Sequence, residues 1–167
     1  MSEIIISNKN QISKKYHSGE HERYEYHKQE VTDARQKYQV RSPAEGNQTV
    51  VAFYTLPPGK SSYPYHYHTT NEEVFYIISG EGILETSDGE RTISAGDIIV
   101  CPVGERGAHR LTNSSETEDL VYLDVDTNNT PDIAYYPHSG KLGIRAAGGV
   151  HDNYRIGGDV DYYHDEL

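Results

Sequence analysis

The sequence predicts an all-β protein, a small sandwich or barrel of short strands. Short runs rich in valine, isoleucine and tyrosine alternate with clusters of turn residues along the central part of the chain. Asp88-Gly89, a dipeptide that strongly favours a hairpin, separates two of these runs. No apolar repeat with a period of about 3.6 residues extends far enough in this part to predict a helix. Many short strands punctuated by turns are typical of a sandwich or barrel.

The strands expected in the core follow one another between residues 50 and 125. The first, at 50–56, reads VVAFYTL and is closed by Pro57-Pro58-Gly59, a strong turn signal. The two runs on either side of Asp88-Gly89 are expected to form a hairpin. The remaining core strands are expected at 65–68, 74–78, 83–86, 91–93, 98–101, 109–113 and 120–125.

Three parts of the chain differ in composition. Residues 1–47 are polar, and we expect an N-terminal arm with one or two short strands or a turn of helix that adds to the barrel. Residues 48–126 are expected to form the core barrel. Residues 127–167 are rich in Asn, Asp, Gly and Tyr, and we expect a C-terminal extension, mostly extended or irregular, that wraps the barrel.

Length, charge and cysteine content limit the class of protein. A chain of 167 residues is long enough for one domain with a core. It has no run of roughly 18 to 20 apolar residues and no signal-peptide pattern. Its net charge of −11 argues against nucleic acid or a membrane as a partner. One cysteine, Cys101, fits a reducing compartment. We therefore expect a soluble, cytoplasmic protein.

Three histidines and a glutamate form the most informative pattern. His66 and His68 are two residues apart, so on a strand they project from the same face. Glu73 follows five residues later, and His109 begins a distant expected strand. Without a metal, such groups inside a barrel would be unpaired, at a cost on the order of 1–3 kcal/mol each. The set therefore predicts a site for a divalent transition metal, such as Mn, Fe, Co, Ni or Zn.

Two motifs containing these residues resemble those of the cupin superfamily, and in particular small single-domain bacterial cupins. The first motif reads Gly59, His66-Tyr67-His68, Glu73 and Gly80. The second reads Gly96, Pro102-Val103-Gly104, His109 and Asn113. The resemblance spans residues 59–113, and Tyr136-Pro137 after the last core strand is similar to an element of the same subgroup. Two extra residues lengthen the loop between Gly104 and His109.

This resemblance implies a cupin-type small β-barrel, also called a double-stranded β-helix or jelly roll. It also implies that His66, His68, Glu73 and His109 are the metal ligands. The fold serves isomerases, dioxygenases, decarboxylases, storage proteins and ligand sensors, so it does not specify an activity. Glu72 is the competing carboxylate, but strand phase favours Glu73 as the ligand and places Glu72 in a turn.

Other polar residues near the motifs have two interpretations each. Asn113 shares the strand phase of His109 and could orient a ligand or water, or it could form the turn before Ser114. Arg106, in the long loop, could anchor a carboxylate or phosphate, or could be solvated. Arg110 is out of phase with His109 and is expected to point away from the pocket.

Tyr65 and Tyr67 alternate with the two histidines and are expected on the outer face of the barrel. A second sheet, the N-terminal arm or a partner subunit would have to cover them, and we predict a homodimer on this basis. Cys101 is expected to be a small buried residue. Of the arm histidines His17, His21 and His27, the third is not in helical phase with the first two, and all three are expected to lie in a solvated arm.

Two functions of different classes follow from these patterns. The first is a metalloenzyme that acts on a small organic metabolite, such as a sugar or a keto or hydroxy acid, by isomerisation or dioxygenation. The second is a non-catalytic module that binds a metal or a small molecule, as a sensor or carrier. The acidic arm shows no helix-turn-helix pattern, which weakens the version with a DNA-binding unit.

Overall fold

The structure is a computed structural model that describes residues 4–32 and 47–158. Within these ranges the chain forms strands, turns and two short 3₁₀ helices, and it contains no α-helix, as the all-β prediction requires. The described part also has no helix long and apolar enough to cross a membrane. The helices are η1 (Lys9–Gln11) and η2 (Glu105–Gly107). The strands are β1 (Lys15–Ser18), β2 (Glu25–Glu30), β3 (Thr49–Leu56), β4 (Tyr67–His68), β5 (Glu73–Ser79), β6 (Glu81–Thr86), β7 (Gly89–Ser94), β8 (Ile98–Cys101), β9 (His109–Asn113), β10 (Leu120–Thr127), β11 (Asp132–Tyr136), β12 (Lys141–Ala146) and β13 (Val150–Arg155).

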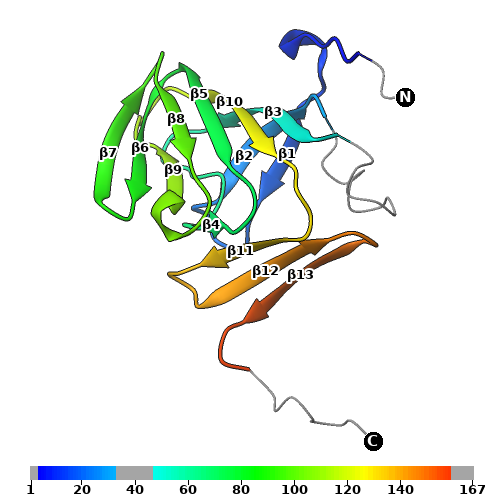
Figure 1. Ribbon diagram of the computed structural model, residues 1–167. Coiled ribbons are helices and arrows are strands. Elements are labelled where there is room, and N and C mark those ends of the chain that lie inside the picture. Colours follow the sequence, from blue (N-terminus) through cyan, green and yellow to red (C-terminus); the bar gives the residue numbers. More distant parts are fainter. Residues whose placement is uncertain (1–3, 33–46, 159–167) are drawn as a thin grey trace, which may run out of the picture.

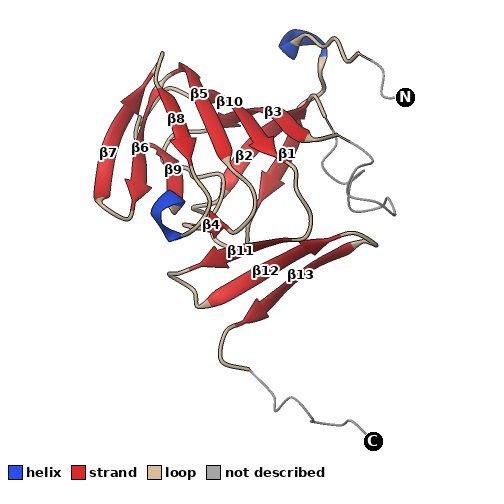
Figure 2. Ribbon diagram, in the orientation of Figure 1, coloured by secondary structure: helices blue, strands red, loops and turns tan. Residues whose placement is uncertain are grey.

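The named strands form three sheets in which neighbouring strands are antiparallel. A six-stranded sheet has the order β1-β2-β3-β10-β5-β8, and a three-stranded sheet has the order β7-β6-β9. A four-stranded sheet has the order β13-β12-β11-β4. Figures 1 and 2 show the first two sheets as the body of the molecule and β11, β12 and β13 as a separate layer below it. Strands β1 and β2 extend the large sheet at its β3 edge.

The hairpin predicted around Asp88-Gly89 joins β6 to β7. Thr86 and Gly89 are register partners, so Ser87 and Asp88 form the loop between them. Gly89 has a φ of 112°, a backbone conformation that L side chains rarely adopt, which explains why glycine follows the loop. All eight expected core strands appear, although the one expected at 65–68 is shortened to β4, with His66 forming only an isolated bridge to His109.

The core lies between the inward faces of the large and the three-stranded sheets. Strand alternation buries every second residue, as in β5, where Phe75 and Ile77 are buried and Tyr76 is exposed. Tyr54 and Tyr122 stack on each other in this core, with ring centroids 5.1 Å apart. The main core side chains are those of Tyr54, Leu56, Phe75, Ile77, Leu84, Ile93, Leu111, Leu120 and Tyr122.

The C-terminal extension is more regular than the sequence suggested. Residues 132–155 form three strands, and β11 pairs with β4 in the register Ala134 to His68. Tyr67 is the register partner of Tyr135 in this sheet and the two rings stack with centroids 5.2 Å apart, while Tyr65, just before β4, stacks on His138 at 4.5 Å. Residues of the C-terminal extension therefore contact both tyrosines within the same chain.

Candidate metal centre

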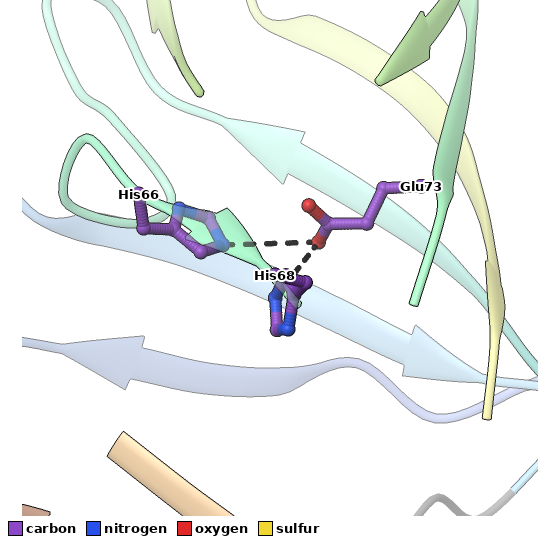
Figure 3. A group of neighbouring side chains, drawn as sticks. All are labelled: His66, His68 and Glu73. Atoms are coloured by element: carbon purple, nitrogen blue, oxygen red, sulfur yellow. Dashed lines mark ion pairs between the residues drawn. The ribbon is translucent and has the colours of Figure 1, made fainter. Parts of the chain in front are cut away.

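The four predicted ligand residues come from three strand regions that meet at one end of the barrel. His66 lies just before β4 and His68 lies in it. Glu73 begins β5 and His109 begins β9. Reciprocal backbone hydrogen bonds between His66 and His109, at 3.1 and 2.9 Å, hold the two segments together. Figure 3 shows the imidazoles of His66 and His68 pointing toward the carboxylate of Glu73.

The loop before His109 is shaped by Gly107. This loop contains η2 and is the one that two extra residues lengthen. A Cβ at Gly107 would lie 1.7 Å from the carbonyl oxygen of Pro102, so no larger residue fits there. The backbone N–H of Gly107 donates to Gly104 at 2.9 Å, which closes the turn. The longer loop is thus compact and delivers His109 to the interior, where it is buried.

The distances within the cluster are those of donors that could share a cation. Ligand atoms of His66, His68 and Glu73 all lie within 4.8 Å of one another. Glu73 Oε1 is 3.8 Å from His66 Nε2 and 3.7 Å from His68 Nε2, and Glu73 Oε2 is 3.2 Å from His109 Nε2. Donors bound at about 2.1 Å to one ion are separated by about 3.0 to 3.5 Å, so these spacings are close to those of a coordination shell.

The hydrogen bonds made by Nδ1 of His66 and His109 determine which ring nitrogen can bind a metal. Nδ1 of His66 lies 2.8 Å from the carbonyl oxygen of Pro64, and Nδ1 of His109 lies 2.8 Å from that of Gly107. A carbonyl only accepts, so each Nδ1 carries the proton and donates. The lone pair of each neutral ring is then on Nε2, the atom that faces Glu73.

His68 reaches the same state through a carboxylate. Its Nδ1 donates to Asp132 Oδ2, and Asp132 Oδ1 accepts a further hydrogen bond from the backbone N–H of Thr70 at 3.0 Å. Asp132 is buried at the start of β11. A carboxylate that orients a histidine in this way is a common outer partner of metal-binding imidazoles. No local pattern indicates this role of Asp132, because it lies 64 residues after His68.

Burial and charge together shift the pKa values of three residues of the cluster. Burial alone would raise the pKa of Glu73, but His109, His66 and His68 hold it well below its ordinary value of 4.5. Burial lowers the pKa of His109 below 6.5, although Glu73 opposes this shift. Burial would also lower the pKa of His68, but the hydrogen bond to Asp132 and the charge of Glu73 raise it above 6.5. At neutral pH Glu73 is therefore ionised and His109 is neutral, as coordination requires.

A cavity of about 260 Å³ opens beside the cluster. Tyr136 forms part of its wall and stacks on His66, with ring centroids 5.7 Å apart and an interplanar angle of 17°. Two cations, Lys28 from β2 and Arg145 from β12, also line it, and so do Asp124 and Asp126 from β10. The cavity thus combines a cluster of metal-type donors with groups of both charges, and it is large enough for a small organic molecule.

The two residues named from sequence as possible ligand-orienting groups do not line this cavity. Arg106 is exposed on η2. Asn113 is buried, its Nδ2 donates to the carbonyls of Leu56 and Glu118, both at 2.8 Å, and its Oδ1 accepts from Ser115 N–H. These contacts match the turn-forming alternative for Asn113. Arg145 on β12 lines the cavity, whereas Arg106 does not.

The remaining sequence-based assignments can be compared with the structure directly. Glu72 is exposed outside β5, in contrast to Glu73. Arg110 points to the outer face, where its Nη2 lies 2.6 Å from Glu85 Oε2. Cys101 is buried in the core, and burial raises the pKa of its thiol to about 12. His21 is exposed on the arm, and the structure groups none of the described arm histidines into a metal-type cluster.

The central part of the chain is similar to known proteins. Residues 52–126 match the family model described as a cupin domain. A curated relative, an oxalate-binding protein of Thermotoga maritima, is 39% identical over 70 residues. That match covers 42% of this chain and 54% of the relative, so the chain spans about half the length of the curated relative.

Solved structures extend the likeness to most of the chain. A sugar phosphate isomerase from a cupin superfamily, of Silicibacter pomeroyi, has a TM-score of 0.73 at 22% identity and covers 90% of this chain and 92% of its own. A predicted oxalate decarboxylase of Thermotoga maritima has a TM-score of 0.58 at 24% identity, with coverages of 73% and 97%. A polyketide cyclase of Streptomyces resistomycificus has a TM-score of 0.54 at 17% identity, with coverages of 79% and 83%. At these identities the likeness concerns the fold, which confirms the predicted barrel.

Proposed function

We propose, from the premise that this chain belongs to the cupin superfamily through residues 52–126, that it is a metalloenzyme acting on a small organic metabolite. The metal would be a divalent transition ion held by His66, His68, Glu73 and His109. One observation carries the proposal: each of the three imidazoles has its Nδ1 engaged as a donor and turns its Nε2 toward Glu73. Nothing about solubility or core packing calls for this arrangement, whereas metal binding does.

The donor set limits the ion and its chemistry. Three imidazole nitrogens and one carboxylate oxygen suit Mn, Fe, Co, Ni or Zn, and availability usually decides among them. When bound, such an ion supplies Lewis-acid activation of a carbonyl or carboxylate oxygen. The three histidines would bind the ion through Nε2, because Pro64, Gly107 and Asp132 keep the protons on their Nδ1 atoms.

The cavity wall supports a substrate with oxygen donors and an anionic group, such as a sugar derivative or a keto or hydroxy acid. Lys28 and Arg145 would pair with the anionic group. Burial, followed by the charge of Glu73, raises the pKa of Asp124 to about 7, and burial raises that of Asp126 as well. A carboxyl group that exchanges a proton near neutral pH suits isomerisation by proton transfer. Dioxygenation remains the competing reaction for the same site.

A second candidate is a non-catalytic binding protein, and one observation favours it. The curated relative at 39% identity is named for binding oxalate, a small dicarboxylate. The cavity of about 260 Å³ could hold such a molecule between the metal centre and the two cations. In this case the ligand would bind tightly to the metal-loaded protein and would leave unchanged.

Metal content and turnover together test the proposal. We expect the purified protein to bind one divalent ion per chain, His68→Ala to lose it and His21→Ala, a change at an exposed arm histidine, to retain it. Elemental analysis measures the content, and circular dichroism checks that both variants are folded. Full metal content in His68→Ala would show that the assigned ligand set is wrong.

A substrate screen separates the two candidates. The metal-loaded protein and the chelator-treated protein are incubated with sugars, sugar phosphates, keto acids and dicarboxylates, and NMR follows the products. Turnover that disappears on chelation supports the enzyme. Metal-dependent binding of oxalate by calorimetry, without any product, supports the binding protein.

A further inference from the structure

Strand β13, at the edge of the four-stranded sheet, holds a cation at the cavity wall. All of its residues are exposed, so core packing does not account for it. The carbonyl oxygen of Asp152 and Oδ1 of Asn153 nevertheless accept hydrogen bonds from the guanidinium of Arg145, at 3.3 and 3.4 Å. Arg145 lies on the neighbouring strand β12 and lines the cavity of about 260 Å³ beside the metal cluster. Both strands lie beyond residues 52–126, which match the cupin domain, so this arrangement belongs to the C-terminal extension.

The position of the Arg145 guanidinium requires a glycine beneath it. Gly143 lies two residues before Arg145 on β12, so both residues face the same side of the sheet, and Gly143 is the register partner of Asn153. A Cβ at Gly143 would lie 3.0 Å from Nη1 and 3.2 Å from Nη2 of Arg145, and 2.6 Å from Oδ1 of Asn153. A larger residue would therefore displace the guanidinium or the amide to which it donates.

The hydrogen bonds of Arg145 leave one edge of its guanidinium unused. Nη1 donates to the carbonyl oxygens of Ile144 at 3.0 Å and Asp152 at 3.3 Å, and Nη2 donates to Asn153 at 3.4 Å. A guanidinium carries five N–H groups, so Nε–H and one N–H of Nη2 remain, and neither has an acceptor within residues 4–32 and 47–158. Nε–H and Nη2–H lie side by side, which is the geometry that binds two oxygens of one carboxylate or phosphate.

Lys28, the other cation of the cavity wall, has its charge balanced by carboxyl groups. Its Nζ lies 3.7 Å from Oε1 of Glu30, and its charge also acts on Asp124 and Asp126. The three acceptors that Arg145 contacts are two carbonyls and an amide, all neutral, and it forms no ion pair with a carboxylate in the described part of the chain. An anion in the cavity therefore gains more from Arg145 than from Lys28.

We infer that Arg145 is the anchor for the anionic end of the ligand, that it binds two oxygens of a carboxylate or phosphate through Nε–H and Nη2–H, and that Gly143 and Asn153 position it. The inference rests on the proposed function, which makes this cavity the substrate site. The guanidinium lies close enough to His68 and Tyr136 for its charge to act on both. A small molecule anchored at Arg145 would thus have its other end beside the metal cluster.

Calorimetry on the full chain as purified tests the anchor, with oxalate and inorganic phosphate as the two probes. We expect at least one to bind, and the tighter of the two identifies the anionic group as carboxylate or phosphate. Arg145→Lys keeps the charge but loses the edge with two donors, so we expect its dissociation constant to rise by about tenfold or more. Lys28→Gln, which removes a whole charge, should raise it by less than about threefold. Arg155→Lys, the same substitution on β13 and away from the cavity, is the matched control and should leave it unchanged.

Gly143→Ala separates the position of the guanidinium from its charge. The variant keeps Arg145 but crowds Nη1 and Nη2, so we expect the dissociation constant of the probe to rise by about threefold or more. Asn153→Ala removes the acceptor of Nη2 and should shift it in the same direction. Gly158→Ala, where the nearest atom would be 3.9 Å from the added Cβ, is the control and should behave as the wild type. Circular dichroism checks that each variant is folded.

The outcomes separate this inference from the proposed function. Binding to Arg145→Lys as tight as to the wild type, or a larger loss in Lys28→Gln than in Arg145→Lys, would overturn the anchor. Failure of both anions to bind would also overturn it, and an unchanged Gly143→Ala would overturn the positioning role. Elemental analysis accompanies each measurement. Weaker anion binding at unchanged metal content supports the anchor, whereas weaker binding that accompanies loss of metal would overturn it. Anion binding that depends on Arg145 in a protein without any divalent ion would count against the proposed metalloenzyme alone.

Discussion

The Nδ1 atoms of His66 and His109 donate to backbone carbonyls of the core barrel, whereas Nδ1 of His68 donates to a side chain of the C-terminal extension. The two regions therefore contribute differently to the site. The first two rings donate to carbonyls only two residues away, at Pro64 and Gly107. These hydrogen bonds form wherever the local loop forms, so the orientation of these ligands comes with the core barrel.

His68 depends instead on a part of the chain that folds onto the core. Its partner, Asp132, begins β11, and that strand reaches His68 only by pairing with β4. Tyr136 and Arg145, which line the cavity, belong to the same sheet. The core thus supplies donors and the extension supplies orientation and much of the cavity wall. It follows that damage to the core should abolish metal binding, whereas damage to the extension should weaken it.

Glu73→Gln, in the core barrel, should cause the largest loss of metal affinity. The change removes the negative charge that all three imidazoles face, while keeping the shape of the side chain. We expect metal affinity to fall by well over the roughly 10–100-fold that loss of an outer partner costs. Competition with a metal-binding dye measures it, with Glu72→Gln, one residue away and exposed, as the control. Equal affinities in the two variants would contradict the assignment of Glu73.

Asp132→Asn, in the C-terminal extension, should cause a smaller loss of metal affinity than Glu73→Gln. An amide can still accept from Thr70 N–H but no longer balances the charge on His68 or fixes its Nδ1 proton as strongly. We expect metal affinity to fall by about 10–100-fold with the fold intact. Asp88→Asn, in the exposed hairpin loop, is the control. An unchanged affinity in Asp132→Asn would mean that the extension does not orient the ligand.

Acidification should weaken metal binding, and His68 should respond first. The pKa of His68 lies above 6.5 and that of His109 lies below it, so a falling pH protonates Nε2 of His68 while His109 is still neutral. Below the pKa of His68, affinity should drop by about tenfold per pH unit, since one proton competes with the ion. Asp132→Asn removes the main cause of the raised pKa and should move the onset to lower pH. A pH profile identical in wild type and variant would contradict this.

Tyr136→Leu should have the smallest effect. The stacked ring fixes the orientation of His66, and such aromatic contacts contribute about 0.5–1.5 kcal/mol beyond burial. We expect metal affinity to fall by a few-fold, while Tyr136→Phe, which keeps the ring, stays at the wild-type value. If the phenylalanine variant lost as much affinity as the leucine variant, the hydroxyl and not the stacking would be responsible.

Sequence alone determined the barrel and predicted the candidate donor residues, because both depend on short-range patterns. Alternation and turn residues specify strands within a few positions, and the spacing of His66 and His68 follows from strand geometry. The same rules favoured Glu73, which faces the three imidazoles, over the exposed Glu72, and they left Asn113 open between two roles.

Only the tertiary structure decided the surroundings of those donors. Asp132, Tyr136 and Arg145 reach the site through the pairing of β11 with β4 and of β12 with β11, contacts between segments far apart in the chain that carry no local signature. Arg106 was suggested because its loop is near His109 in sequence, yet η2 turns its side chain to solvent. The contacts of Tyr65 with His138 and of Tyr67 with Tyr135 depend on the same docking of the extension. Local geometry can be read from neighbouring residues, whereas the choice of which distant strand docks against which is set by packing over the whole molecule.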